Sequence, residues 1–277
     1  MYKLNLTKVQ IEHLLFIKNN KENVTITQTA RKFGCSKVNS KKILDRMIVV
    51  GVLYKEENNY KLTDIGKDLA DFYDKSLEKN KYLFEKLLNV GEKAAEKLSI
   101  DLMTKENTEL EESIDRKFNI LKRINDFEGP IAGTDLSEIL PQGRYKLDFI
   151  IKKADEEINN SFIEDSMAIK GFETVAYLNI CKESYIELFA KTINKSQGGY
   201  LKKGIATKLF FYEKGQEIEI DSKNKTFIIP LSIIDYWSKL DELILISSLH
   251  FTIKAQVGIN THSNSTNFIF VVNLCSV

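Results

Sequence analysis

The strongest constraint on the fold lies in the first 62 residues, where signals for three short helices are followed by a signal for a hairpin. Thr7 and Gln10 have the spacing of a capping box, in which the two side chains accept N–H groups at the start of a helix. A second helix is expected over 27–34 and a third over 37–50, and each is ended by a glycine. Two short helices that meet at a glycine-containing turn are typical of a helix-turn-helix unit.

The third expected helix, capped by Ser36, has an apolar stripe and a cationic surface. The stripe is expected to pack on the first two helices and consists of Ser40, Ile43, Leu44 and Met47. The cationic surface suits a DNA major groove, where Lys and Arg meet phosphates or guanine and Asn can read adenine. The candidate DNA-binding residues of this helix are Lys37, Asn39, Lys41, Lys42 and Arg46. Asn39 is the candidate base reader, and the lysines mainly position the protein.

Two short alternating runs surround an Asn-rich turn after the third helix. Val52–Lys55 and Tyr60–Leu62 flank the residues 56–59, a pattern that predicts a β-hairpin. Three helices followed by a hairpin predict a winged helix-turn-helix over residues 1–62. Lys55 and Lys61 stand at the base of the wing and are expected to touch flanking phosphates.

Three short motifs occur in order along residues 26–70. They are small-x-x-Phe-Gly in the second helix, Leu-x-x-Met-x-x-x-Gly-Val-Leu around the end of the third, and Leu-Thr-Asp-x-Gly after the hairpin. With these motifs, the segment of about residues 5–90 resembles the DNA-binding domain of the MarR and iron-dependent-repressor (DtxR-like) winged-helix regulators. The resemblance implies double-stranded DNA as partner and transcription regulation as function.

The DtxR-like members of that class also sense a divalent metal through ligands on the first helix and on two helices after the wing. Glu12 stands where the resemblance implies the first-helix carboxylate, and His13 follows it. Residues 65–103 contain neither His nor Cys, and Ile100–Thr104 occupies the place of the family's Glu-x-x-Glu-His cluster. Because transition metals need converging His, Cys or carboxylate ligands, neither a metal nor another cofactor is expected.

Charge is segregated along the chain although the net charge is only +1. Residues 1–61 carry 12 Lys or Arg against 5 Asp or Glu, whereas residues 62–115 carry 8 against 14. A basic N-terminal part favours a polyanion partner. The alternative is that Lys is the default surface residue, since the chain has 35 Lys and 5 Arg.

Residues 63–115 are expected to form a helical dimerisation or connector segment, with a polar linker over 105–115. Its apolar positions are too numerous for a free helix and predict burial against the rest of the chain or a second subunit; they are Ile65, Leu69, Phe72, Leu77, Leu83, Phe84, Leu87 and Leu88. A homodimer suits this class, because two recognition helices about one DNA turn apart read a palindrome.

Residues 116–170 are expected to form a helical unit, with helices over 118–124, 134–140 and 145–158. This order resembles a second, degenerate helix-turn-helix, although Lys146, Lys152 and Lys153 are mixed with acids.

Residues 171–277 then predict an antiparallel-sheet α+β domain for effector binding or assembly. Its strands are expected over 174–180, 205–212, 217–220 and 225–229, with helices over 183–193 and 232–245 and a hairpin of 250–259 and 267–274.

No nucleophile–base constellation is found in the chain, so an enzyme is the least supported class. His250 begins a strand and is expected to be a surface or hydrogen-bonded residue, and His262 is expected in the loop at the hairpin tip. Cys181 and Cys275 end strands and are expected to be small buried groups.

The composition is that of a globular chain with two domains, with 277 residues of which 43% are hydrophobic. Three Cys without a C-x-x-C pair, no signal peptide and no apolar run of membrane-spanning length predict a cytoplasmic protein.

We therefore expect a sequence-specific transcription regulator that binds double-stranded DNA through its winged helix and carries a C-terminal ligand-sensing or oligomerisation domain. Two alternatives remain. One is a replication or plasmid-maintenance initiator with tandem DNA-binding helical units, and the other is an adaptor whose winged helix contacts protein.

Overall fold

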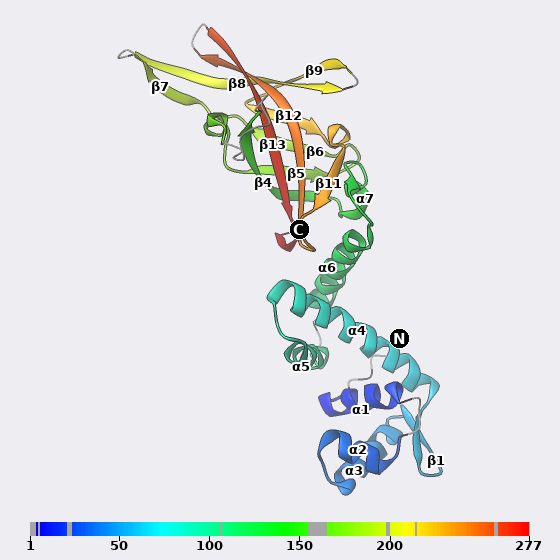
Figure 1. The fold of residues 1–277 in the computed structure, drawn as a ribbon. Coiled ribbons are helices and arrows are strands. Elements are labelled where there is room, and N and C mark those ends of the chain that lie inside the picture. Colours follow the sequence, from blue (N-terminus) through cyan, green and yellow to red (C-terminus); the bar gives the residue numbers. More distant parts are fainter. Residues whose placement is uncertain are drawn as a thin grey trace, which may run out of the picture. The chain divides into compact units, whose positions relative to one another are not determined.

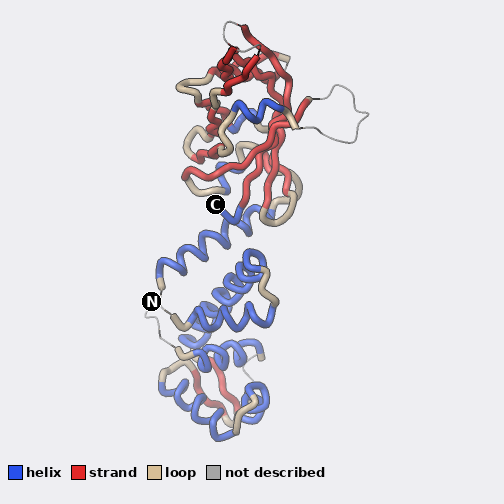
Figure 2. The backbone as a smooth tube through the Cα atoms, turned by 90° about the vertical axis from the view of Figure 1, so that its left-hand side faces the viewer, coloured by secondary structure: helices blue, strands red, loops and turns tan. Residues whose placement is uncertain are grey.

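The structure is a computed structural model that describes residues 4, 6–20, 24–105, 107–154, 165–197, 200–213, 215–257 and 260–276. The chain divides into two compact units, Met1–Phe118 and Asn119–Val277, each with its own interior. Helices make up most of the first unit and strands most of the second (Figure 1, Figure 2). In the described residues, no helix is both long and apolar enough to cross a membrane.

The first unit begins with three helices and a two-stranded antiparallel hairpin, as predicted. These elements are α1 (Lys8–Asn19), α2 (Ile26–Phe33), α3 (Lys37–Val49), β1 (Leu53–Glu56) and β2 (Asn59–Leu62). The predicted caps are formed: the Thr7 N–H donates to Gln10 Oε1 at 2.9 Å, and Gly34 ends α2 in the left-handed region with φ 61°.

The interior of this part is built from the apolar stripes of α1 and α3 and from the inner face of the hairpin. Ile11, Leu14, Leu44, Met47 and Tyr60 are each 0% exposed. The Tyr60 N–H donates to the Val24 carbonyl at 2.8 Å, which ties β2 to the segment before α2. The hairpin is therefore held on the same core that orients α3.

Two helices follow the hairpin within the first unit, α4 (Asp64–Leu88) and α5 (Glu92–Met103). Thr63 caps α4, because its Oγ1 accepts the Gly66 N–H at 3.0 Å and donates to the Gly51 carbonyl at 2.7 Å. Thr63 thus links the first turn of α4 to Gly51, which lies just after the end of α3.

The expected linker over 105–115 is wrong for most of its length, because α6 spans Thr108–Asp126. Asn107 begins this helix by accepting the Leu110 N–H at 3.0 Å on its Oδ1. Glu109 and Glu111 lie in the first turn, where the helix dipole favours negative charge. The polar, acidic composition that suggested a linker is therefore the composition of a helix start.

In the part of the second unit that the structure describes, eleven strands form one antiparallel sheet. Strand order along its main path is β10-β6-β5-β4-β13-β12-β11-β3, and β8 pairs with β12, β7 and β9. The strands are β3 (Ile131–Ala132), β4 (Gly143–Lys153), β5 (Ala176–Ile180), β6 (Tyr185–Phe189), β7 (Ile193–Gln197), β8 (Tyr200–Glu213), β9 (Gln216–Asp221), β10 (Thr226–Pro230), β11 (Tyr236–Lys239), β12 (Ile244–Val257) and β13 (Asn260–Asn273). Short helical turns are α7 (Leu136–Ile139), η1 (Met167–Gly171), η2 (Leu231–Ile233) and η3 (Leu274–Ser276).

The long strands β12 and β13 lie side by side at the centre of this sheet (Figure 1). Their inward side chains form an aromatic cluster in which the ring of Phe268 lies 5.3 Å from Phe251 and 5.6 Å from Phe172, in both cases edge to face. Such pairs add about 0.5–1.5 kcal/mol beyond the area they bury.

The helix predicted over 145–158 is wrong, because residues 143–153 form β4. Leu147, Phe149 and Ile151 are buried while Asp148 and Ile150 are exposed, which is the period of a strand. Residues 155–158 of the expected helix lie outside the described residues. Because its recognition element is a strand, the degenerate second helix-turn-helix does not form.

Two further predicted helices are also strands. Residues 185–189 form β6, with Ile186 and Leu188 buried in alternation, and residues 232–245 contain η2, β11 and the start of β12. β6 pairs with the preceding strand β5 and with the more distant β10, and β11 pairs with the following strand β12 and with the distant β3. Sheet pairing therefore overrides the local helix signal.

The predicted strands over 174–180, 205–212, 217–220 and 225–229 correspond to β5, β8, β9 and β10. The predicted C-terminal hairpin is confirmed but is longer than expected. Residues 260–266, expected as a polar loop, belong to β13 and pair with residues 251–257 of β12.

Candidate nucleic-acid interface

One face of α3 fixes the helix in the core and leaves the other face free. Ser40, Leu44 and Met47 are each 0% exposed, as the apolar stripe predicted. Ser36 caps the helix through its Oγ, which accepts the Asn39 N–H at 3.2 Å. The orientation of the outer face is therefore set by buried contacts and does not depend on the exposed side chains.

All five α3 residues predicted to bind DNA are exposed. None of their cationic groups forms an ion pair with any residue that the structure describes. Residues 24–55 carry seven Lys or Arg and a single acid, Asp45. This stretch therefore presents an excess of positive charge that no described carboxylate neutralises by direct contact.

Helical spacing separates the five residues into two groups. Asn39, Lys42 and Arg46 are related as i, i+3 and i+7, so they follow one stripe on the side away from the buried residues. Lys37 and Lys41 are related as i and i+4 and lie roughly 150° around the helix from that stripe, with Val38 and Asp45 between the two groups. The two groups therefore border the exposed face of α3 on opposite sides.

Three exposed residues near this surface are absent from the sequence-based set. Val38 is 66% exposed in the first turn of α3, where an apolar side chain has no core to enter. Arg31 and Lys32 are exposed in the last turn of α2, just before the turn into α3. Their position beside the turn at Gly34 was the sequence signal that could have added them to the set.

The two lysines of the hairpin differ in their surroundings. Lys55 is exposed, whereas Lys61 is paired with Glu56 on the neighbouring strand. Lys61 lies opposite Tyr54 and Lys55 lies opposite Tyr60, so the two lysines point to opposite faces of the hairpin. The structure therefore does not bring Lys55 and Lys61 together.

Lysines elsewhere in the first unit hold the helices to one another. Lys18 Nζ of α1 lies 2.8 Å from Asp71 and 2.6 Å from Asp74, both on α4. Partial burial acts to lower the pKa of Lys18, but its hydrogen bonds to Asp71 and Asp74 outweigh this and raise the pKa above its ordinary value. The hydrogen bond from Lys18 in turn lowers the pKa of Asp71. These cations serve internal contacts, unlike those of α3.

The residues at the metal positions that the resemblance implies do not fit a metal. His13 is 1% exposed, its Nδ1 lies 2.7 Å from the Val9 carbonyl, and its ring stacks on Phe33 with centroids 4.1 Å apart. Burial lowers the pKa of His13. Asp101, at the end of α5, is paired with Lys8. Throughout the described residues, no cluster of three or more His, Cys, Asp or Glu has the proximity of a metal site.

The second unit places its histidines on β12 and β13. His250 Nδ1 lies 2.9 Å from Asn267 Oδ1, which fits the hydrogen-bonded surface residue expected. His262 lies within β13 and not in a loop, because the hairpin extends past it. Cys181 and Cys275 are exposed, so the expectation that they are buried is wrong.

No family model matches the chain, and no curated protein matches it. Among solved structures it is similar to T. acidophilum IdeR, at 8% sequence identity and a TM-score of 0.35, over 82% of this chain and 99% of that one. It is also similar to the manganese regulator SloR, at 10% identity and a TM-score of 0.36, over 82% of this chain and 100% of that one. A third similar structure is ScaR with bound Zn²⁺, at 10% sequence identity and a TM-score of 0.35. The match covers 80% of this chain and 98% of that one. TM-scores below 0.5 do not establish a common fold or function.

Proposed function

We propose that the chain is a transcription regulator that binds double-stranded DNA, with residues 1–62 as a winged helix and α3 as its recognition helix. The observation that carries the proposal is the exposed, unpaired cationic face of α3 on a helix fixed by three buried side chains. A rigid helix with free cations meets the two needs of groove binding, which are a fixed register and neutralisation of phosphate.

In this proposal the outer stripe of α3 enters the major groove. Asn39 offers the donor and acceptor that pair with adenine, and Arg46 can contact guanine or phosphate. Lys37 and Lys41, on the opposite border of the exposed face, meet the sugar–phosphate backbone. Lys55 adds a phosphate contact from the hairpin, and Lys61 contributes only if a phosphate replaces Glu56 as its partner.

We propose that α4 and α5 also form the contact between two copies of the chain. Three large apolar side chains on these helices support this, because they remain 44–63% exposed: Ile65, Leu88 and Leu98. A twofold-symmetric dimer would present two copies of α3 to successive major grooves.

For the second unit we propose ligand sensing or assembly. An open groove of about 440 Å³ between η1 and the strands β8, β12 and β13 supports ligand sensing. Its lining is mainly apolar, with the polar groups of His262 and Asn264 on one wall. Ligand sites of this size typically combine an apolar wall with a few polar groups.

The test is the salt dependence of binding to a DNA duplex. The double variant Lys37→Ala/Lys41→Ala removes the two α3 charges assigned to the sugar–phosphate backbone, so the slope of log affinity against log salt should fall by about 0.9 per lost phosphate contact. Lys182→Ala/Lys223→Ala removes two exposed charges from the second unit and serves as the matched control, with no change expected. An unchanged slope in the α3 variant would remove α3 from the interface.

The two alternatives make different predictions. An initiator with tandem helical DNA-binding units has lost its main support, because the segment expected to supply the second recognition helix is β4. An adaptor that contacts only protein predicts no salt-dependent binding to duplex DNA. The free cations of α3 favour the regulator over the adaptor.

A further inference from the structure

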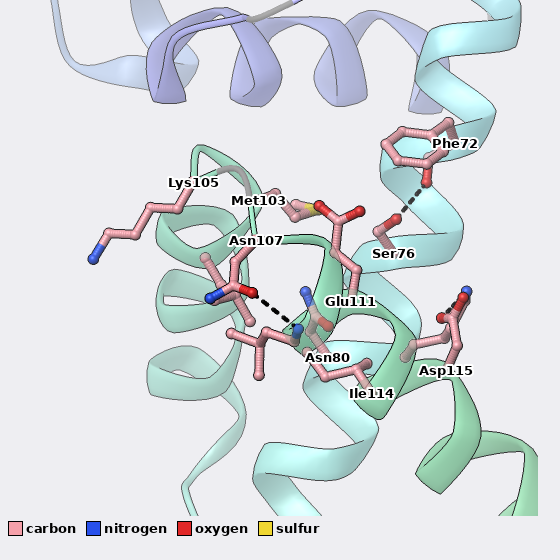
Figure 3. A pocket seen from close by; sticks show the side chains of 12 residues that line it. Phe72, Ser76, Asn80, Met103, Lys105, Asn107, Glu111, Ile114 and Asp115 are labelled. Carbon is pink, nitrogen blue, oxygen red and sulfur yellow. Dashed lines mark hydrogen bonds and ion pairs between the residues drawn. The ribbon is translucent and has the colours of Figure 1, made fainter. Parts of the chain in front are cut away.

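A cavity of about 80 Å³ lies between α4, the end of α5 and the first turns of α6, all within the first unit (Figure 3). It is distinct from the α3 surface and from the groove of the second unit. An engineered cavity of about 150 Å³ accepts benzene, so this one takes roughly three or four non-hydrogen atoms, with the rest of a ligand at its mouth.

The walls of the cavity are part apolar and part polar. Leu102, Met103 and Ile114 line it, and Phe72 and Leu110 lie at its edge, each 39% exposed. The other lining residues are polar or charged: Ser76, Lys79, Asn80, Lys105, Asn107, Glu111 and Asp115. Of these polar residues, only Asn80 is buried.

Asn80 is 7% exposed and projects from α4 into the cavity (Figure 3). Its amide has two N–H donors and two acceptor lone pairs. It makes no hydrogen bond with any residue in the described parts of the chain. Its amide atoms retain contact with solvent, so the group is available to an occupant of the cavity.

The fold gives no reason for an asparagine at this position. Asn80 lies in the interior of a 25-residue helix, where Asn is a poorer helix former than Ala or Leu. This low helix propensity opposes Asn80 in the empty protein, and pairing of the amide with a ligand would offset it.

The charges around the cavity are already balanced or directed elsewhere. Lys79 Nζ lies 2.5 Å from Asp115 Oδ1, which joins α4 to α6 at the rim. Lys105 extends away from the cavity (Figure 3), and Glu111 has a partner of its own. An uncharged ligand is therefore the best match.

We propose that this cavity binds a small uncharged molecule that carries a carboxamide. A carboxamide presents one donor and one acceptor side by side and so forms a pair of N–H···O bonds with the Asn80 amide. The apolar body of the ligand lies against Leu102 and Ile114. The site requires no DNA and stands whether or not α3 is a recognition helix.

The test uses propionamide as the probe and the methyl groups of the four methionines as the readout. With the full chain labelled in its methionine methyl groups, NMR titration should shift the Met103 signal saturably. Met47 lies in the core around α3 and Met167 in the second unit's groove, so both signals should stay fixed. Butanone, which lacks the amide donor, and propionate, which is charged, are the matched probes and should bind at least tenfold more weakly.

Two variants separate binding from folding. Asn80→Leu should weaken propionamide binding at least tenfold and raise the unfolding midpoint of the free protein, because Leu is a better helix former than Asn. Ile114→Trp fills the cavity while keeping Asn80 and should also abolish the Met103 shift. Lys42→Ala/Arg46→Ala should leave that shift unchanged, which separates this site from the proposed DNA contact.

Four results would overturn the proposal. They are the absence of a saturable Met103 shift, equal binding of propionamide and butanone, wild-type affinity in Asn80→Leu, and a lower unfolding midpoint in that variant. The second would mean an apolar cavity that is not selective, and the last would mean a structural role for Asn80.

Discussion

Gly66→Ala is expected to destabilise the first unit, although the same change in most helices is stabilising. Gly66 lies in the first turn of α4, and a Cβ added there would stand 2.0 Å from the Val52 carbonyl oxygen and 3.0 Å from its carbonyl carbon. Val52 is 0% exposed, and its carbonyl accepts the Thr63 N–H at 3.1 Å. The clash is therefore with backbone that is itself fixed by the core.

The magnitude follows from three opposing effects. Replacing Gly by Ala in a helix gains about 1 kcal/mol from propensity. Overpacking of a filled site costs about 1–3 kcal/mol, and breaking the hydrogen bond between Thr63 and Val52 costs about 1 kcal/mol more. The free energy of unfolding should fall by roughly 1–3 kcal/mol, so the steric effect outweighs the helix propensity.

Urea unfolding followed by circular dichroism measures this change. Gly91→Ala is the matched control, because Gly91 also begins a helix, has φ −64°, and has nothing within 4 Å of the added Cβ. Because Gly is preferred to Ala at an N-cap, that control should cost about 0.5–1 kcal/mol, without a steric contribution. If Gly66→Ala proves as stable as the wild type, the first turn of α4 does not approach the Val52 carbonyl as described, and the steric argument fails.

Three other changes test separate parts of the fold. Because burial lowers the pKa of His13 below its ordinary 6.5, the unfolded chain takes up a proton that the folded chain does not as the pH falls through 6.5. The free energy of unfolding should then decrease by up to about 1.4 kcal/mol per pH unit below that value. In urea melts at about pH 7.5 and about pH 5.5, His13→Gln should remove this pH dependence. The control His262→Gln should keep it. Ser36→Ala removes the α3 cap and should cost about 1 kcal/mol in thermal unfolding, and no loss would mean that the cap is not formed in solution. Phe268→Ala, at a site that is 0% exposed, should cost about 3–5 kcal/mol; a cost below 1 kcal/mol would contradict the aromatic cluster.

The first 62 residues were predictable because their signals are local. Capping by Thr7 and Ser36 and termination at Gly34 each depend on residues within one helical turn. The periodicity of α3 likewise separated buried Leu44 from exposed Lys42. Sequence reasoning therefore gave the helices and the hairpin with boundaries close to those observed.

The second unit was predicted less well because its strands are defined by distant partners. Residues 145–151 hold apolar side chains at both strand and helix spacings, and only pairing with β5 and β13 decides between them. β6 likewise has a distant partner, β10, on the side away from its sequence neighbour β5. The long-range pairings leave no local trace in the sequence.

For the candidate interface, the sequence identified which side chains are exposed, but not which of them form ion pairs within the protein. Lys42 and Arg46 are exposed as expected, and so is Lys55. Lys61 pairs with Glu56 across the hairpin, a contact that depends on strand register. The Asn80 cavity gave no sequence signal, because it forms where three helices meet.

The most direct test of the central proposal is binding of the purified chain to the DNA upstream of its own gene, compared with a scrambled duplex of equal length and composition. The account predicts salt-sensitive binding with a preference of about 10³ or more for the upstream sequence, and loss of that preference in Asn39→Ala. Absence of binding to either duplex at low salt would contradict the account and show that the cationic face of α3 serves another partner.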